Sequence, residues 1–175
     1  MRIKTEKGFT LLEIMIAVFV LGVGLLGLAH LQITALKTNQ SAEHKTQAIF
    51  LASDILDRIR ANQRAIQQDS GFYEIDIDEE SPGCDNPDAP PADLTKRAEF
   101  IAKCDLNMWR TQVAAYLPNG NAKVECPDYD AKIEFATCIV TIEWRDIQTD
   151  SDNARDDDTP SRIRIEGTIG GQGPL

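Results

Sequence analysis

One carboxylate lies inside a long apolar stretch near the start of the chain. Glu13 is the fifth residue of a run that begins at Phe9, and no Asp, Glu, Lys or Arg occurs from Ile14 to Leu36. An ionised side chain costs about 2.5–3.5 kcal/mol at the centre of a bilayer on insertion scales, and less near its edge. Because that cost needs compensation, Glu13 is a candidate for pairing with a positive charge.

The residues before Glu13 suggest a source for that charge. Cleavage between Gly8 and Phe9 would give Phe9 a new α-amino group. Phe9 and Glu13 are four residues apart, so they share a helix face. The amine of a neighbouring chain could then pair with Glu13 inside an apolar bundle. Glu13 is therefore a candidate residue for docking and register between subunits.

The apolar run is long enough to cross a membrane. As a helix rising about 1.5 Å per residue, residues 9–36 would extend roughly 42 Å, against about 30 Å for the hydrocarbon core of a bilayer. The leader, residues 1–8, has three basic residues and one acid, which predicts a cytoplasmic N-terminus and a translocated remainder. A plain signal anchor gives no reason for an acid at Glu13, and a secretory cleavage site would follow the apolar region.

Four cysteines follow the apolar run, and their even number in a translocated domain predicts disulfides. Three pairings are possible. We prefer Cys84–Cys104 with Cys126–Cys138, because each closes the shorter local loop. A zinc site is disfavoured because no Cys-x-x-Cys pair occurs.

The remaining segments predict an α+β fold. Residues 37–66 should continue the N-terminal helix, with an apolar stripe through Ile55 and Ile59 that needs a sheet to cover it. Residues 67–175 should form a disulfide-bonded periplasmic domain. It has an irregular segment to residue 92 and a helix from Asp93 or Thr95 to about Leu117. We expect strands at Ala122–Cys126, Ala131–Phe135, Cys138–Arg145 and Ser161–Ile169.

Single residues of this domain have specific expectations. On the second helix, Ile101, Met108, Val113 and Tyr116 are expected to mark a buried face, with Trp109 as a core anchor. The acidic segment from Asp146 to Asp158 could suggest calcium. It lacks EF-hand spacing, so we expect a solvated hairpin tip.

Catalysis and nucleic-acid binding find no support in the sequence. His30 and His44 have no nucleophile at a readable spacing, and there is no phosphate loop or metal-ligand cluster. The net charge is −10, and no basic stripe offers a nucleic-acid interface. We therefore expect no enzyme activity, no cofactor and no bound metal.

The N-terminus resembles that of type IV prepilins, through a basic leader followed by Gly8-Phe9-Thr10-Leu11-Leu12-Glu13 and the apolar run. The resemblance implies cleavage after Gly8 by prepilin peptidase, N-methylation of Phe9 and assembly into a pilus or pseudopilus. Within that family, residues 21–32, Asp105-Leu106 with Trp109, Leu117-Pro118-Asn119-Gly120, and Val140 with Trp144 are similar to PilV-type minor pilins.

The family likeness implies a structural role. The chain would be a minor pilin that waits in the inner membrane, joins other minor pilins and the major pilin, primes pilus assembly and stays at the tip. One alternative is a type II secretion minor pseudopilin of the I type, which shares the N-terminal motif. Another is a membrane-tethered adhesin that never polymerises.

Overall fold

The computed structural model describes residues 10–84, 89–127, 135–145 and 160–170. The chain divides into two compact units, residues 1–40 and 41–175. Helix α1, Leu11–Ala61, supplies most of the first unit and the first helix of the second. Among the described residues, this helix alone is long and apolar enough to span a membrane. The predicted Gly8–Phe9 cleavage site lies outside the described residues.

The sequence predicts one near-continuous helix from Phe9 to about Ile66. Among the described residues, helix α1 ends at Ala61 and a short helix α2, Gln63–Gln68, follows after a break at Asn62 that the sequence does not predict. The Asn62 amide nitrogen donates to the carbonyl oxygen of Ala98 at 2.8 Å and to the Tyr73 hydroxyl at 3.1 Å. These tertiary contacts hold Asn62 in a non-helical conformation, as a short amide side chain readily permits.

The second unit contains two further helical segments. The 3₁₀ helix η1, Ser70–Tyr73, follows α2, and helix α3 runs from Leu94 to Tyr116. Asp93 caps α3, since its carboxylate accepts from the Lys96 backbone N–H at 3.3 Å. The predicted start and end of this helix are therefore close to the observed ones.

A three-stranded antiparallel sheet completes the second unit, in the order β1, β2, β3. The strands are Asn121–Glu125, Phe135–Trp144 and Ser161–Gly170. Val124 pairs with Val140, and Val140 pairs with Ile165. The alternation predicted for β2 is confirmed, because Cys138, Val140, Ile142 and Trp144 are all buried. The expected strand at Ala131–Phe135 falls largely outside the described residues.

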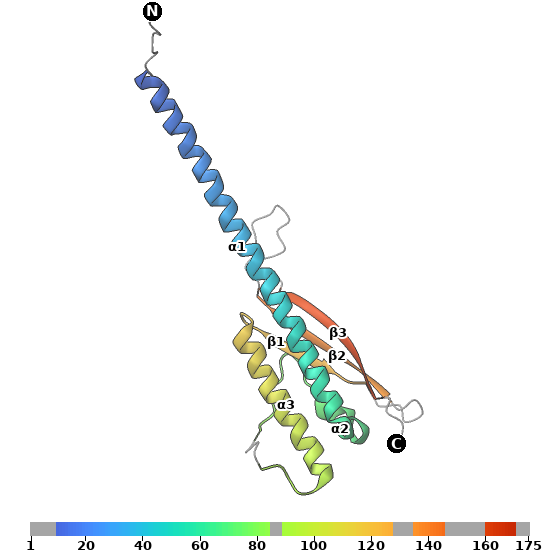
Figure 1. The fold of residues 1–175 in the computed structure, drawn as a ribbon. Coiled ribbons are helices and arrows are strands. Elements are labelled where there is room, and N and C mark those ends of the chain that lie inside the picture. The colour runs from blue at the N-terminus through green and yellow to red at the C-terminus, as the bar shows by residue number, and fades with distance from the viewer. Residues whose placement is uncertain (1–9, 85–88, 128–134, 146–159, 171–175) are drawn as a thin grey trace, which may run out of the picture. The chain divides into compact units, whose positions relative to one another are not determined.

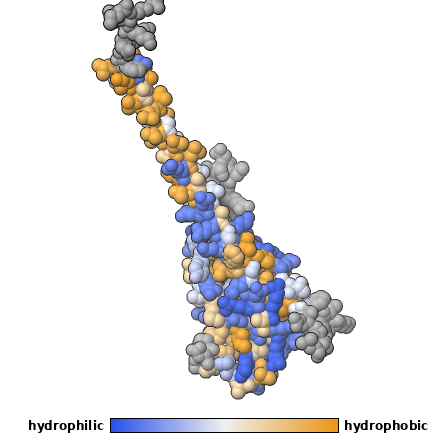
Figure 2. Space-filling model, viewed as in Figure 1, coloured by the Kyte–Doolittle hydropathy of each residue, from blue (hydrophilic) through white to orange (hydrophobic). Residues whose placement is uncertain are grey.

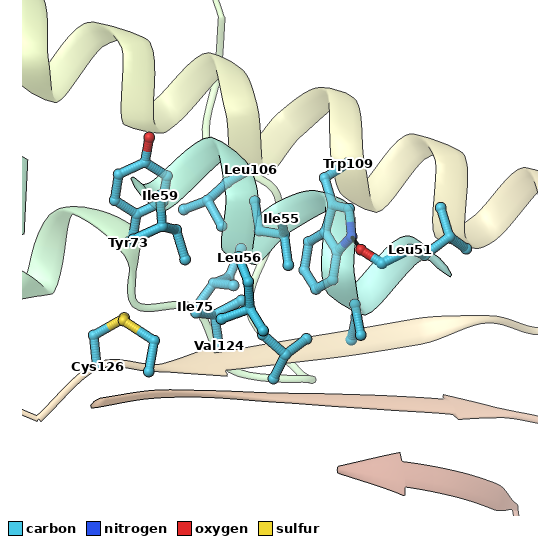
Figure 3. Close-up of a cluster of buried hydrophobic side chains, with 14 of the residues drawn as sticks. Leu51, Ile55, Leu56, Ile59, Tyr73, Ile75, Leu106, Trp109, Val124 and Cys126 are labelled. Carbon is cyan, nitrogen blue, oxygen red and sulfur yellow. Dashed lines mark hydrogen bonds between the residues drawn. A yellow bond between two sulfur atoms is a disulfide. The ribbon is translucent and has the colours of Figure 1, made fainter. Parts of the chain in front are cut away.

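The core lies between the sheet and the two long helices (Figure 1, Figure 3). The predicted stripe of α1 is confirmed, with Ile55 and Ile59 fully buried. Gly167 on β3 lies directly under α1, since a β-carbon there would be 2.9 Å from the Leu56 methyl groups.

The prediction for the buried face of α3 is partly wrong. Val113 is buried and Trp109 is a core residue, but Met108 is 42% exposed and Tyr116 is 60% exposed. The core face instead runs through small and aliphatic residues, namely Ala98, Ala102, Leu106, Trp109, Val113 and Leu117. Apolar residues form two rows on this helix, and the predicted face combined Val113 from the buried row with Met108 and Tyr116, which are exposed.

Candidate functional site

The N-terminal turn of α1 carries the candidate assembly residue. Thr10 precedes the helix, and its hydroxyl oxygen accepts from the Glu13 backbone N–H at 3.3 Å. This is half of a capping box, in which the side chains of a Thr and of a Glu three residues later each accept a hydrogen bond from the other residue's backbone N–H. The geometry gives Glu13 a second reason to occur here, because a carboxylate near a helix N-terminus is stabilised by the helix dipole.

Glu13 lies on an otherwise apolar helix surface. It lines a shallow patch with Ile14, Ala17, Val18 and Leu21. These neighbours are exposed, and in the part of the chain that the structure describes, no cation pairs with the Glu13 carboxylate. Figure 2 shows that apolar side chains dominate the surface of this half of α1. A carboxylate in the first turn of such a helix is therefore available to a charge from outside the chain.

The proposed mate of Glu13, the Phe9 amine, is not described. Gly8 and Phe9 both lie outside the described residues, so the cleavage and methylation sites remain predictions. The acidic segment Asp146–Asp158 also lies outside them. Within the described ranges, no group of three or more His, Cys, Asp or Glu side chains could hold a metal ion.

The four cysteines form two disulfides in the second unit. Cys84 joins Cys104 with their Cα atoms 4.7 Å apart, and Cys126 joins Cys138 at 4.2 Å. This is the pairing that the loop lengths favoured. The first bridge ties the segment before residue 85 to α3, and the second ties the end of β1 to β2.

A polar network, missed by the sequence analysis, fixes the end of α1 against α3. The Tyr73 hydroxyl donates to Asp105 at 2.7 Å, and Asp105 also pairs with Arg58 at 3.4 Å. Burial and the Asp105 carboxylate raise the pKa of Tyr73. For Arg58, burial acts to lower the pKa, but the carboxylates of Asp54 and Asp105 outweigh it and raise the pKa above its ordinary value.

The network had only a weak signal in the sequence. The local spacing of the sequence offers Arg58 only Asp54, four residues earlier, as a partner on the same helix face. Asp105 is 47 residues away along the chain, and no local spacing links the two. The network positions α3 and η1 against the end of α1.

Two family models match parts of the chain. Residues 3–29 match the prokaryotic N-terminal methylation motif, and residues 30–79 match the family described as type IV pilin Tt1218. No curated protein and no solved structure matches the chain. Together, the two matches support a type IV pilin. The long apolar helix, the further helix and the antiparallel sheet are consistent with a type IV pilin fold.

Proposed function

We propose that the chain is a minor pilin of a type IV pilus, similar to PilV. The observation that carries the proposal is the Glu13 carboxylate, in the first turn of an exposed apolar helix that begins within the residues matching the methylation motif. In this proposal, prepilin peptidase cuts after Gly8 and the new Phe9 amine is methylated. The Phe9 amine of one subunit then pairs with Glu13 of the next.

The pairing would set the axial register between subunits. Phe9 and Glu13 are four residues apart and so share a helix face. When one subunit is displaced along its neighbour, its Phe9 amine meets the Glu13 carboxylate at one axial position on that apolar face. In an apolar bundle, an unpaired carboxylate is costly and a paired one much less so. Wrong registers are therefore disfavoured more strongly than by apolar packing alone.

The place of the chain in the cell follows from the same proposal. It would sit in the inner membrane with its N-terminus in the cytoplasm and the disulfide-bonded unit in the periplasm. It would then join other minor pilins and the major pilin, prime assembly and remain at the pilus tip. The role is structural, and no cofactor is required.

The first test is the N-terminus of the working protein. Mass spectrometry of the chain from sheared pili should find Phe9 as the first residue, carrying one methyl group. An initiator methionine at the N-terminus of the assembled protein would contradict the proposal.

The second test separates the two roles of Glu13. Glu13→Gln keeps a side chain that can complete a capping box but removes the charge, and Thr10→Val removes the capping hydroxyl but keeps the charge. We expect Glu13→Gln and Glu13→Ala to insert normally and to assemble poorly, and Thr10→Val to assemble nearly as the wild type does. Normal piliation with Glu13→Gln would show that the capping role is sufficient.

The pseudopilus alternative uses the same N-terminal chemistry. Deleting the gene and scoring surface pili against enzyme secretion separates the two machines. A chain found uncut in membranes, and absent from sheared filaments, would instead favour the tethered adhesin.

A further inference from the structure

Strand β3 lies at an edge of the sheet, and no other described strand pairs with its outer side (Figure 1). The opposite edge is closed, because Ile75 and Val124 of β1 exchange two backbone hydrogen bonds of 3.0 Å. β3 itself contains no proline, and it pairs with β2 along its whole length without a bulge. Prolines and bulges are devices by which natural sheets block a free edge, so β3 remains competent to pair.

The backbone groups on this edge follow from the alternation of hydrogen bonds in the sheet. In an antiparallel ladder, successive residues direct their N–H and C=O groups to opposite sides of the strand. Val124 bonds the segment beyond β1, so Val140, which lies opposite it, directs its groups to β3 and bonds Ile165. The backbone N–H and C=O groups of Arg164 and Glu166 therefore point away from β2.

The carbonyl oxygen of Thr168 agrees with this alternation and marks one limit of the open edge. Thr168 follows Glu166 by two residues, so its carbonyl also points away from β2. That oxygen accepts a hydrogen bond from the Arg60 guanidinium of α1 at 3.4 Å. Arg60 thus covers the end of the strand, and the part that we call the open edge is residues 162–166.

Apolar side chains line the core side of the open edge. Ile163 and Ile165 pack against the core and stay partly exposed. On α1, Ile49 lies seven residues before Leu56, so both are on nearly the same side of the helix. Leu56 lies over Gly167 of β3, and Ile49 is 44% exposed. A strand added beside β3 would therefore place every second side chain next to apolar groups.

The outer face of the open edge is charged. Arg162 is paired with Glu143 of β2 at 2.8 Å. Arg164 and Glu166 pair loosely within the strand at 3.8 Å, and both side chains are mostly exposed, so they are open to a second partner. Opposite charges directly across two antiparallel strands are favourable and like charges are not. These two residues therefore select which strand can be added.

We propose that the open edge accepts an extended strand from a different pilin subunit, antiparallel to β3. This inference rests on the proposed function. A row of unpaired N–H and C=O groups is matched by another extended backbone, whose main-chain hydrogen bonds give affinity while alternate side chains give specificity. The added strand should carry an acid opposite Arg164, a base opposite Glu166 and an apolar residue between them.

A second copy of β3 matches these charges but not the orientation. Antiparallel pairing centred on Ile165 would place Arg164 of each copy opposite Glu166 of the other. However, β3 runs in the same direction as the second half of α1, because Leu56 lies over Gly167 and Arg60, one turn later, reaches the next residue. The pairing would reverse this half of α1 in one copy. Two chains that enter one membrane through the preceding part of the same helix do not permit that reversal.

The size of the open edge favours a partner that is held nearby. A strand of about five residues buries far less than the roughly 800 Å² on each partner that a stable soluble complex needs. Confinement in one membrane or filament raises the effective concentration of a neighbour and removes that requirement. The partner is therefore a tethered subunit whose added strand runs in the direction opposite to β3.

The first test uses the full chain in cells that assemble its pilus. A benzophenone amino acid replaces Arg164 in one variant and Thr137 in a control, since Thr137 is exposed on the same outer face but belongs to the central strand. We expect irradiation to link position 164, and not position 137, to a different pilin at a segment that alternates apolar and charged residues. Equal products at both positions, a product only with a second copy, or no pilin product at position 164 would overturn the inference.

A proline substitution supplies the second arm. Arg164→Pro removes an N–H that faces the open edge and leaves the β2 ladder intact, as proline on an edge strand does. Arg164→Ala is the matched control, because it removes the same side chain and keeps the N–H. Arg164→Pro should be incorporated into sheared pili about tenfold less than Arg164→Ala, a difference of about 1.4 kcal/mol.

The fold of the proline variant is checked separately. Arg164→Pro should keep both disulfides and a cooperative unfolding transition in urea; if it unfolds, the crosslinking result decides alone. Equal incorporation of folded Arg164→Pro and Arg164→Ala would show that the open edge is not a contact. An uncut wild-type chain in sheared pili would instead overturn the proposed function.

Discussion

The indole nitrogen of Trp109 donates a hydrogen bond to the backbone carbonyl oxygen of Leu51, 2.8 Å away and 58 residues earlier in the chain. Trp109 is fully buried, so its ring fills the junction of α1 and α3 while its polar atom is satisfied (Figure 3). This bond helps to fix the axial position of α3 relative to the second half of α1. The positions of Asp105 opposite Arg58 and of Ala98 opposite Asn62 depend on that alignment.

Trp109→Phe should destabilise the second unit by about 1–3 kcal/mol, because it removes the hydrogen bond and leaves part of the ring volume unfilled. Urea unfolding of the chain in detergent measures the loss. Met108→Leu, one position away at a side chain that is 42% exposed, serves as the control and should change stability by less than about 0.5 kcal/mol. Equal effects of the two substitutions would contradict a core role for Trp109.

Tyr73→Phe should cost about 2 kcal/mol near neutral pH, because the hydroxyl donates to the Asp105 carboxylate. The pKa of Tyr73 is raised by burial and by Asp105. A group with a raised folded pKa adds stability below its unfolded value, about 10 for tyrosine, and loses it as the pH rises further. The stability difference between wild type and variant should therefore stay constant from about pH 7 to 9 and shrink above about pH 10.

The control is Tyr116→Phe, because Tyr116 is 60% exposed and its substitution should leave the free energy of unfolding near neutral pH unchanged. A wild-type minus Tyr73→Phe difference that grew above about pH 10 would mean that the ionised hydroxyl is favoured in the fold, against the burial seen here.

The sequence predicts those parts of the fold that local periodicity specifies. The alternation of Cys138, Val140, Ile142 and Trp144 identifies the buried face of β2, because successive side chains of a strand point to opposite faces. The apolar run and the Ile55–Ile59 stripe predict α1 in the same way. For the candidate site, the position of Glu13 in an uncharged run is enough to single it out.

The sequence cannot predict which of two apolar rows on α3 the core uses. Met108 and Val113 are equally acceptable core residues by type, and tertiary contacts decide between their rows, among them the bond from Trp109 to Leu51 and the pairing of Asp105 with Arg58. The break at Asn62 depends on Ala98 and Tyr73, so it is a tertiary effect that overrides the helical propensity of the segment. The pairing of Arg58 with Asp105 has the same origin.

The turn between α3 and β1 should tolerate no side chain at Gly120. A β-carbon there would be 2.5 Å from the Val113 carbonyl oxygen and 3.0 Å from that of Leu117, and backbone atoms cannot move aside easily. Asn119, just before it, has a φ of 51°, so the turn is already in the left-handed region at one position. We expect Gly120→Ala to lower stability by more than about 2 kcal/mol.

The matched control is Gly83→Ala, because no atom lies within 4 Å of a β-carbon at Gly83. Its unfolding transition in urea should coincide with that of the wild type. Should Gly120→Ala behave in the same way as this control, the close packing of the turn on α3 would be incorrect.

Removal of the two disulfides should lower the free energy of unfolding by different amounts. Replacing Cys84 and Cys104 by alanine should lower the free energy of unfolding by about 3 kcal/mol, the chain-entropy value for a loop of this length. No larger loss is expected, because Asn107 and Arg110 still hold the segment before residue 85 through hydrogen bonds to its carbonyl oxygens. Replacing Cys126 and Cys138 removes a shorter loop closure of similar value, and it also empties two positions that are fully buried.

The Cys126–Cys138 variant should therefore be the less stable of the two, by about 1 kcal/mol or more for the lost core contacts. Neither variant should lose membrane insertion, since all four cysteines lie outside the apolar run. Urea unfolding ranks the variants, and mapping of oxidised peptides from the wild type tests the premise. A peptide joining Cys84 to Cys138 would refute the pairing, because Cys138 is buried in the sheet opposite Gly167, whereas Cys84 reaches α3 through Cys104.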